Sequence, residues 1–174
     1  MDELIKKLQT DFDGLEISTL AKTRITISTK KESILLLLSY LKRMGYDHLA
    51  IISCNDWIKD NELELVYIVS HYLEKDYGPD SEIDKFNIII KTRIPREKAR
   101  FVTVLDVFEN AEPYERELHE MFGIYFEGHP RLTLLMLERN YKIPPFRKDF
   151  NTKKYVDDLY GNIPTIEERK KGKK

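Results

Sequence analysis

The chain of 174 residues contains a single cysteine, Cys54, and only seven glycines and seven prolines. One cysteine excludes a disulfide within the chain and an iron–sulfur cluster held by this chain alone, because each needs more than one thiolate. The glycines are not spaced as they are in loops that bind phosphate groups, so no standard nucleotide site is expected. The composition therefore indicates a chain without a redox centre or a nucleotide of its own.

Long hydrophobic runs are also scarce. The longest aliphatic run is Ile34–Leu38, whereas a transmembrane helix needs about 20 apolar residues. The first residues, Met1–Leu4, are acidic and do not resemble the apolar centre of a secretion signal. We therefore expect the chain to reach a membrane only through partner proteins.

Charge is distributed unevenly along the chain. Residues 1–130 contain 17 Lys and Arg and 24 Asp and Glu, a net charge of −7, whereas residues 131–174 contain 12 and 6, a net charge of +6. A basic segment behind an acidic body indicates a negatively charged partner, which could be a protein, a nucleic acid or a membrane surface. The charged fraction of 34%, with a single glutamine, favours a thermophilic source.

Hydrophobic periodicity predicts a body of helices and strands in mixed order. The predicted order is helix, strand, helix and three strands, and two neighbouring hairpins require antiparallel pairing. We therefore expect an α+β fold with a sheet of about four strands, mainly antiparallel, and with helices on one face. The predicted helices are Asp2–Phe12 and a segment from Ile34 to Gly45, and the predicted strands are Arg24–Ser28, His48–Ser53, Leu63–Leu73 and Phe86–Ile94.

The C-terminal part of the chain differs from the body. A short helix is expected to begin at Glu112-Pro113, since proline suits the first turn of a helix. After Gly123 the periodicity fades, and residues 124–174 carry scattered aromatic side chains and four prolines. Such a segment cannot easily form its own core. We predict a body, residues 1–123, and an extended C-terminal arm, residues 124–174, which folds onto a partner and not onto its own body.

A catalytic alternative depends on the short helix. The run from His119 to Gly123 begins like a zinc protease motif, but Gly123 stands where the motif needs a second histidine. Glu115 and His119 are four residues apart and could begin a metal site, although third and fourth ligands are not apparent. A metal-dependent hydrolase that uses Glu117, His119 and Glu120 stays open as an alternative. A nucleic-acid-binding protein that uses the basic arm is another, although the acidic body would repel phosphates.

Three linked blocks carry a more specific signal. They are Glu115–Ile124, Gly128–Pro130 and Pro145–Phe150. In this order the blocks resemble the signature of the 30-kDa subunit family of respiratory complex I, which has related subunits in membrane-bound nickel–iron (NiFe) hydrogenases. Phe146 stands where the family has leucine, and Pro113 stands where it often has tryptophan. These departures indicate a divergent branch, most similar to the archaeal hydrogenase type.

The resemblance implies a hydrophilic, non-catalytic subunit of an ion-pumping oxidoreductase in hydrogen metabolism or in quinone-linked electron transport. Its partners would be a large catalytic subunit, of the NiFe or 49-kDa type, and a small iron–sulfur subunit, and it would brace the two for electron transfer. No cofactor would lie in this chain, whereas other subunits would hold iron–sulfur clusters or a NiFe centre. The location implied is peripheral, on the cytoplasmic side of the cell membrane, without nucleic acid.

The resemblance also implies a set of partner-binding residues. Charge-assisted contacts from these residues would fix one docking geometry. An ion pair within the chain, which would hold the arm to its own body, is the open alternative for each of them. The residues are Glu115, Arg116, Glu117, Glu120, Phe122, Gly123, Gly128, His129, Pro130, Arg147, Lys148 and Asp149.

Overall fold

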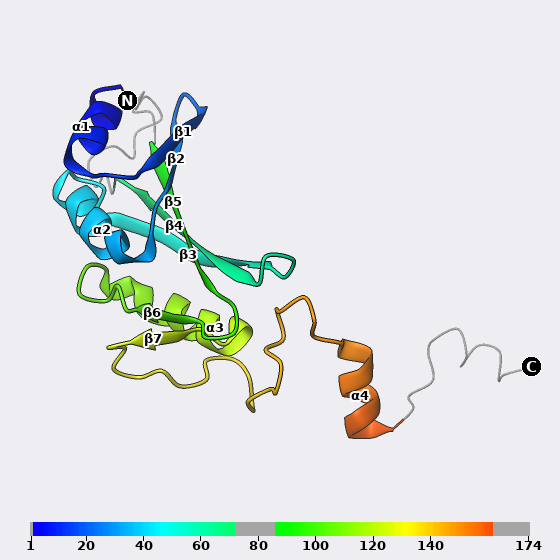
Figure 1. Ribbon diagram of the computed structural model, residues 1–174. Coiled ribbons are helices and arrows are strands. Elements are labelled where there is room, and N and C mark those ends of the chain that lie inside the picture. The colour runs from blue at the N-terminus through cyan, green and yellow to red at the C-terminus, as the bar shows by residue number, and fades with distance from the viewer. Residues whose placement is uncertain (1, 72–85, 162–174) are drawn as a thin grey trace, which may run out of the picture.

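The computed structural model describes residues 2–71 and 86–161 (Figure 1). A central sheet is followed along the chain by a helix and a smaller sheet, and then by the arm. The elements are α1 (Asp2–Asp11), β1 (Glu16–Ala21), β2 (Arg24–Ser28), η1 (Lys31–Ser33), α2 (Ile34–Arg43), β3 (His48–Trp57), β4 (Glu62–Ser70), β5 (Asn87–Pro95), β6 (Arg100–Val102), η2 (Glu109–Ala111), α3 (Glu112–Phe122), β7 (Tyr125–Glu127) and α4 (Thr152–Tyr160).

The central sheet has five strands in the order β1-β2-β5-β4-β3. All neighbours pair antiparallel except β2 and β5, which are parallel. The predicted α+β fold with a mainly antiparallel sheet is confirmed. The sheet has one strand more than expected, because the sequence pattern does not predict β1. Only Ile17 of this edge strand packs against the core, so β1 lacks the alternating apolar pattern by which strands are identified.

The hydrophobic core lies between this sheet and the helices, as expected for helices on one face. Helices α1, α2 and α3 all contribute to one buried cluster, and α1 and α2 lie on the same side of the sheet in Figure 1. A fully buried Leu or Ile side chain stabilises the fold by about 1.5–3 kcal/mol. The cluster includes Leu37, Leu38 and Leu41 of α2, Leu63, Leu65, Tyr67 and Val69 of β4, and Ile88, Ile90 and Ile94 of β5.

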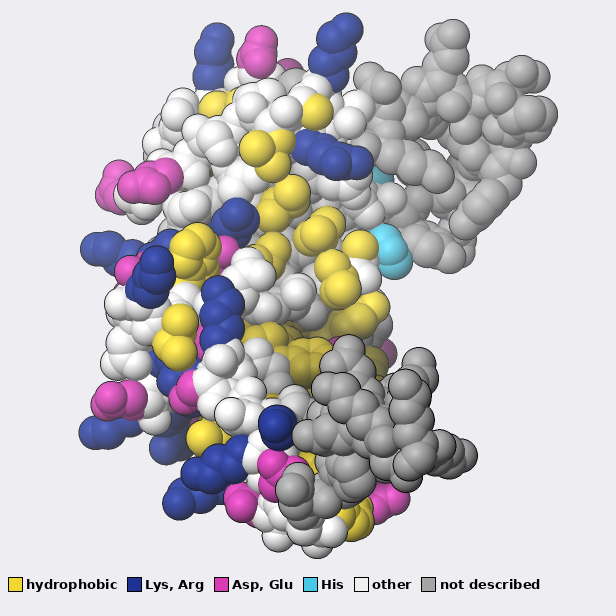
Figure 2. All heavy atoms as spheres, turned by 90° about the vertical axis from the view of Figure 1, so that its right-hand side faces the viewer, with side chains coloured by type: hydrophobic (Ala, Val, Ile, Leu, Met, Phe, Trp, Pro, Cys, Tyr) yellow, Lys and Arg dark blue, Asp and Glu magenta, His cyan; other side chains and the backbone are white. Residues whose placement is uncertain are grey.

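The other face of the sheet carries a row of apolar side chains. Figure 2 shows the molecule turned from the view of Figure 1, with hydrophobic side chains gathered down the middle and most of the charged ones to their left. Ile51, Ile68 and Ile89 are direct cross-strand neighbours on β3, β4 and β5. Ile51 is exposed, and the other two are half-buried. The body therefore has an apolar stripe that points away from its core.

The core continues past the boundary expected at residue 123. Strand β7 pairs in parallel with β6, and both Ile124 and Phe126 are buried in the core cluster. The prediction that the arm leaves the body from residue 124 onward is therefore wrong for residues 124–127. Two buried side chains on so short a segment give no detectable period, although both are almost fully buried.

The arm also contains a helix that periodicity does not predict. The side chain of Asn151 caps α4, because its Oδ1 accepts a hydrogen bond from the Lys154 amide at 2.9 Å. No residue of α4 is fully buried, and the helix lies apart from the sheet in Figure 1. The basic end of the arm beyond residue 161 lies outside the described residues. Within residues 2–71 and 86–161, no helix is long and apolar enough to cross a membrane.

Candidate functional site

The three sequence blocks meet around helix α3. One pass of the arm, residues 128–137, lies along a face of α3, and a second pass, residues 144–149, lies at its C-terminal end. The sequence predicted these blocks as partner contacts. The structure shows what holds them to one another within the chain.

Arg116 and Glu120 hold the backbone of the first pass. The Arg116 guanidinium donates to the carbonyl oxygens of Thr133, at 3.1 Å, and Leu134, at 2.8 Å. The Glu120 carboxylate accepts hydrogen bonds from the three consecutive amides of Leu135–Leu137, at 2.7, 3.0 and 3.3 Å. The two side chains lie one helical turn apart and carry opposite charges, which suit carbonyl and amide groups respectively. These contacts hold the arm by its backbone groups.

The second pass of the arm caps the end of α3. The Phe146 amide donates to the Met121 carbonyl at 3.0 Å, and the Nε of Arg147 donates to the Phe122 carbonyl at 2.7 Å. Both carbonyls belong to the last turn of the helix, where no partner exists within the helix itself. A cation at this end also interacts favourably with the helix dipole. Arg147 and Phe122 therefore contact each other within the chain.

Gly123 ends α3 in a left-handed conformation, with φ 71° and ψ 32°. A Cβ atom at this position would lie 2.9 Å from the Cγ of Pro144 and 3.4 Å from a nitrogen of Arg147. The second pass can therefore approach the helix only over a glycine. Gly123 serves both the turn and the packing of the arm.

An ion-pair network links the second pass to the body. The Arg96 Nε donates to the buried carboxylate of Asp56 at 2.9 Å, and another Arg96 nitrogen reaches Asp149 at 2.5 Å. The Lys148 amide donates to Asp56 at 2.8 Å. Burial alone would raise the pKa of Asp56, but the hydrogen bonds from Arg96 and Lys148 outweigh it and hold the pKa below its usual range. Asp149 is thus bound to the body, and its pKa is also lowered, chiefly by Arg96.

Sequence reasoning missed Asp56 and Arg96. A signal for Asp56 was present, because it shares the inward register of β3 with the buried Ile52 and Cys54. A carboxylate in such a position is unusual unless it is paired. Arg96 gives no comparable signal, since its partner is 40 residues away in the chain.

Glu115 lies in the core and not on a docking surface. Its side chain is fully buried and accepts hydrogen bonds from the Thr103 hydroxyl, at 2.6 Å, and from the Val104 amide, at 2.7 Å. Burial raises the pKa of Glu115 to about 7, against the downward effect of these two hydrogen bonds. The expectation that Glu115 contacts a partner is therefore wrong for the chain as it folds here, because the side chain has no accessible surface. Its carboxylate joins α3 to the segment after β6.

Glu120 and Phe122 are buried as well, whereas the remaining predicted partner-binding residues keep accessible surface. Glu117 is half-buried and makes no hydrogen bond or ion pair with the described residues, and the side chains of Pro130 and Lys148 are exposed. Gly128 has φ 85°, and a Cβ there would lie 3.3 Å from Thr103. The Nδ1 of His129 accepts from the Arg131 amide at 3.1 Å. Contacts of these residues with a partner stay a prediction.

Two of the three residues of the hydrolase alternative are engaged elsewhere. Glu120 binds the arm, and His119 donates through Nδ1 to the Ile124 carbonyl at 2.9 Å. No group of three His, Cys, Asp or Glu side chains that could hold a metal occurs in the described parts of the chain. The Cys54 thiol is buried, and burial raises its pKa to about 12, so it is a poor nucleophile. The contacts around α3 therefore hold a segment of the chain in place.

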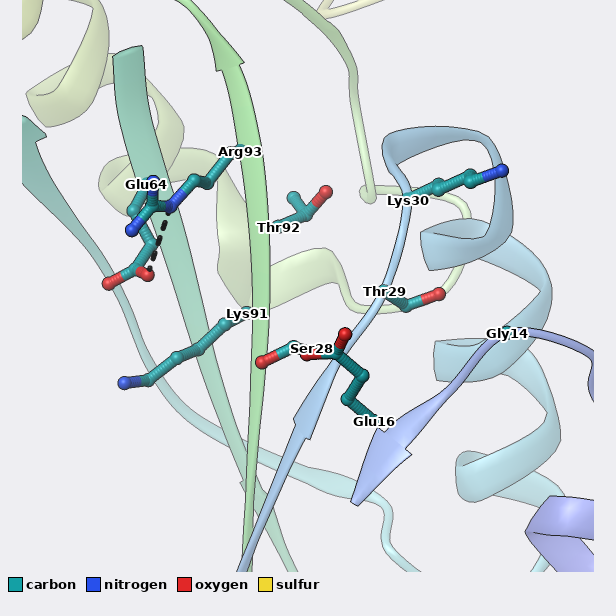
Figure 3. A pocket seen from close by; sticks show the side chains of 9 residues that line it. All are labelled: Gly14, Glu16, Ser28, Thr29, Lys30, Glu64, Lys91, Thr92 and Arg93. Atoms are coloured by element: carbon teal, nitrogen blue, oxygen red, sulfur yellow. Dashed lines mark ion pairs between the residues drawn. The ribbon is translucent and has the colours of Figure 1, made fainter. Parts of the chain in front are cut away.

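A hollow away from α3 offers no catalytic combination either. It lies over β2 and β5, and Figure 3 shows the side chains around it. The Arg93 Nε forms an ion pair with Glu64 at 3.7 Å. The lining mixes cations and carboxylates with hydroxyl groups and contains no histidine or cysteine. Its residues are Gly14, Glu16, Ser28, Thr29, Lys30, Glu64, Lys91, Thr92 and Arg93.

Comparison with known proteins finds a matching family model and similar sequences. Residues 27–156 match the family model described as respiratory-chain NADH dehydrogenase, 30 Kd subunit. The chain is 35% identical over 113 residues to a subunit of the F(420)H(2) dehydrogenase of Methanosarcina mazei, covering 64% of this chain and 65% of that protein. It is 27% identical over 172 residues to a subunit of the NADH-quinone oxidoreductase of Yersinia pestis, covering 91% of this chain and 27% of that protein. The chain therefore spans less than two thirds of the length of either relative.

Two solved structures have a similar fold. A chain of the membrane-bound sulfane sulfur reductase, described as an archaeal respiratory membrane complex, aligns with a TM-score of 0.80 and 28% identity over 95% of this chain and 94% of that one. A trypsin-resistant fragment of Nqo5 aligns with a TM-score of 0.61 and 24% identity over 75% of this chain and 98% of the fragment. The second likeness is one of fold alone. The first includes nearly the whole chain.

Proposed function

The chain belongs to the family of the 30-kDa subunit of respiratory-chain NADH dehydrogenase, and on this premise we propose that it is a non-catalytic subunit of a membrane-bound respiratory oxidoreductase complex. The resemblance identified from the sequence motifs is confirmed, and the similarity to an archaeal membrane complex agrees with the archaeal branch. One observation carries the proposal. The motif residues around α3 hold the arm in place through hydrogen bonds.

In this proposal the chain braces a large catalytic subunit against a small iron–sulfur subunit. The support is the chemistry of the arm, where several cations are exposed and form no ion pair with the described residues. Such cations attract an acidic protein surface and help to orient it. They are Arg139, Lys142, Lys148, Lys153 and Lys154.

The redox chemistry is assigned to other subunits of the complex. Iron–sulfur clusters, and a NiFe centre if the complex is a hydrogenase, would lie in these partners, and the complex would couple electron transfer to ion pumping. One similar protein is part of an F(420)H(2) dehydrogenase, and another is part of a sulfane sulfur reductase. The proposal therefore does not specify which electron donor and acceptor the complex uses. We place the chain on the cytoplasmic side of the membrane, attached through its partners.

Affinity purification from detergent-solubilised membranes of the native host tests this function. A chain with an N-terminal tag should bring down a large subunit and an iron–sulfur subunit, with the visible absorption of iron–sulfur clusters. The same tagged chain expressed alone in another host should be colourless. Recovery of the chain from the native membranes without any oxidoreductase subunit would overturn the proposal.

A further inference from the structure

The contacts of Arg116 and Glu120 leave one part of the arm both fixed and apolar. The amides of Leu135 and Met136 are held by the Glu120 carboxylate, yet their side chains are 38% and 59% exposed. We define these two residues as the arm tip. An isolated exposed apolar residue needs no explanation, whereas adjacent exposed apolar side chains on a fixed backbone suit a contact surface.

Glu120 and Arg116 order the backbone of the arm tip before any partner binds. Glu120 is 6% exposed, so its charge has little water around it and depends on the three amides that it binds. Arg116 holds the two preceding carbonyls in the same way. A backbone ordered in advance loses less entropy when it binds, so the side chains it carries make better anchors. Methionine and leucine suit an apolar pocket, and methionine adapts to its shape.

A third apolar side chain is fixed at the same end of α3. Phe146 is 56% exposed, although its amide is bonded to Met121 and its ring meets that of Phe122 edge to face, with 5.8 Å between the ring centroids. Glu120 and Met121 are consecutive residues. Both passes of the arm therefore present an apolar side chain near the end of the same helix.

We propose that the arm tip, Leu135 and Met136, inserts into an apolar pocket on an acidic protein subunit of the complex. The acidic character of the partner follows from charge complementarity, because two exposed cations, Arg139 and Lys142, lie just beyond the tip and outnumber the one exposed carboxylate there, Glu138. None of the three forms an ion pair in the described chain. This inference rests on the proposed function, since it assigns the anchor by which the arm binds.

A protein fits the arm tip better than an anionic lipid surface. Residues 128–150 form neither helix nor strand. In the apolar layer of a membrane, backbone groups of such a segment would stay without hydrogen bonds, which strongly disfavours insertion. A protein pocket can accept the two side chains and supply partners for the backbone groups around them.

The test replaces both anchors in the native host. The tagged chain that carries Leu135→Ser and Met136→Ser should retain about tenfold less of the large subunit than the wild-type chain, since buried anchors dominate binding at interfaces. The control is Leu36→Ser on α2, which removes a side chain of similar exposure, 60%, far from the arm. The control should retain the wild-type amount, and all three chains expressed alone should unfold at similar temperatures.

The outcomes distinguish a failure of the proposed function from a failure of the proposed anchor. If the wild-type chain brings down no oxidoreductase subunit, the proposed function fails and the inference fails with it. If the wild-type chain brings down the complex and the double variant retains as much, only the inference is overturned. A photoreactive benzoylphenylalanine at position 136 gives a second readout. A cross-link to an apolar peptide of a subunit supports the inference, and a cross-link to lipid alone contradicts it.

Discussion

Replacement of Glu115 by glutamine should change how stability depends on pH. Glu115 is fully buried, and its carboxylate accepts hydrogen bonds from Thr103 and Val104 without a cation in contact among the described residues. Glutamine has the same size and can still accept from the Val104 amide. Its NH₂ group can donate to the Thr103 oxygen once that hydroxyl turns. Glu115→Gln therefore removes the charge and keeps the packing.

The magnitude follows from the pKa of this group. Its value in the folded chain is about 7, raised by burial from an ordinary 4.5. Between these two pH values the unfolded chain loses the proton while the folded chain keeps it. The free energy of unfolding of the wild-type chain therefore falls as pH rises through this window, and it stays low above it. The loss assigned to Glu115 is about 3 kcal/mol.

Urea unfolding of the chain expressed alone, at several pH values from about 4.5 to 8, measures this effect. The stability of Glu115→Gln relative to the wild-type chain should increase by about 3 kcal/mol across this range. Glu117→Gln removes the same charge from the same helix at an accessible position and controls for the change in net charge. A difference between Glu115→Gln and wild type that stays constant with pH would refute the assignment of a buried, proton-binding carboxylate.

Three further predictions concern the contacts that hold the arm on α3 and the redox properties of the chain. Gly123→Ala should lower stability by about 1–3 kcal/mol, because alanine is strained at φ 71° and its Cβ meets Pro144; an unchanged melting temperature would contradict this. Glu120→Gln should weaken the bonds to residues 135–137, so trypsin should cleave after Arg139 faster, whereas equal cleavage rates would show that the charge is not needed. The wild-type chain expressed alone should show no visible absorption band, since Cys54 is its only thiol, and an iron–sulfur band in the purified chain would disprove that expectation.

Periodicity predicted the long elements that pack on the core and failed for the short strands β6 and β7 and for the elements that bury little surface. Strand β2 was predicted with its observed bounds, Arg24–Ser28, because polar and apolar residues alternate along it. Strand β1 and helix α4 were not predicted, because β1 is an exposed edge strand and α4 has no buried residue. The arm was predicted to need a partner surface. For residues 133–137 and for Phe146 and Arg147, helix α3 of the same chain provides that surface, and Lys148 and Asp149 bind Asp56 and Arg96.

The candidate site was predicted as a set of residues but not as a set of contacts. The sequence left open whether the charged residues of α3 bind a partner or the chain itself. Glu120 and Arg116 bind backbone groups of the arm that lie 15 to 18 residues away. Because nearly every residue type carries the same backbone groups, the sequence does not indicate which of them are bound. Glu115 was misjudged because a glutamate is seldom fully buried. Its burial depends on Thr103 and Val104, which sequence reasoning did not connect with it.

The central claim is that α3 and the body hold the arm before any partner binds. Amide hydrogen exchange on the chain expressed alone tests it most directly, because the amides of Leu135, Met136, Phe146 and Lys148 all donate to groups of the body. The amide of Arg139 donates to no described group and serves as the internal reference. We expect the four bonded amides to exchange at least about tenfold more slowly than this reference. Exchange of all four at the rate of Arg139 would contradict the account, because the arm would then be held by a partner alone.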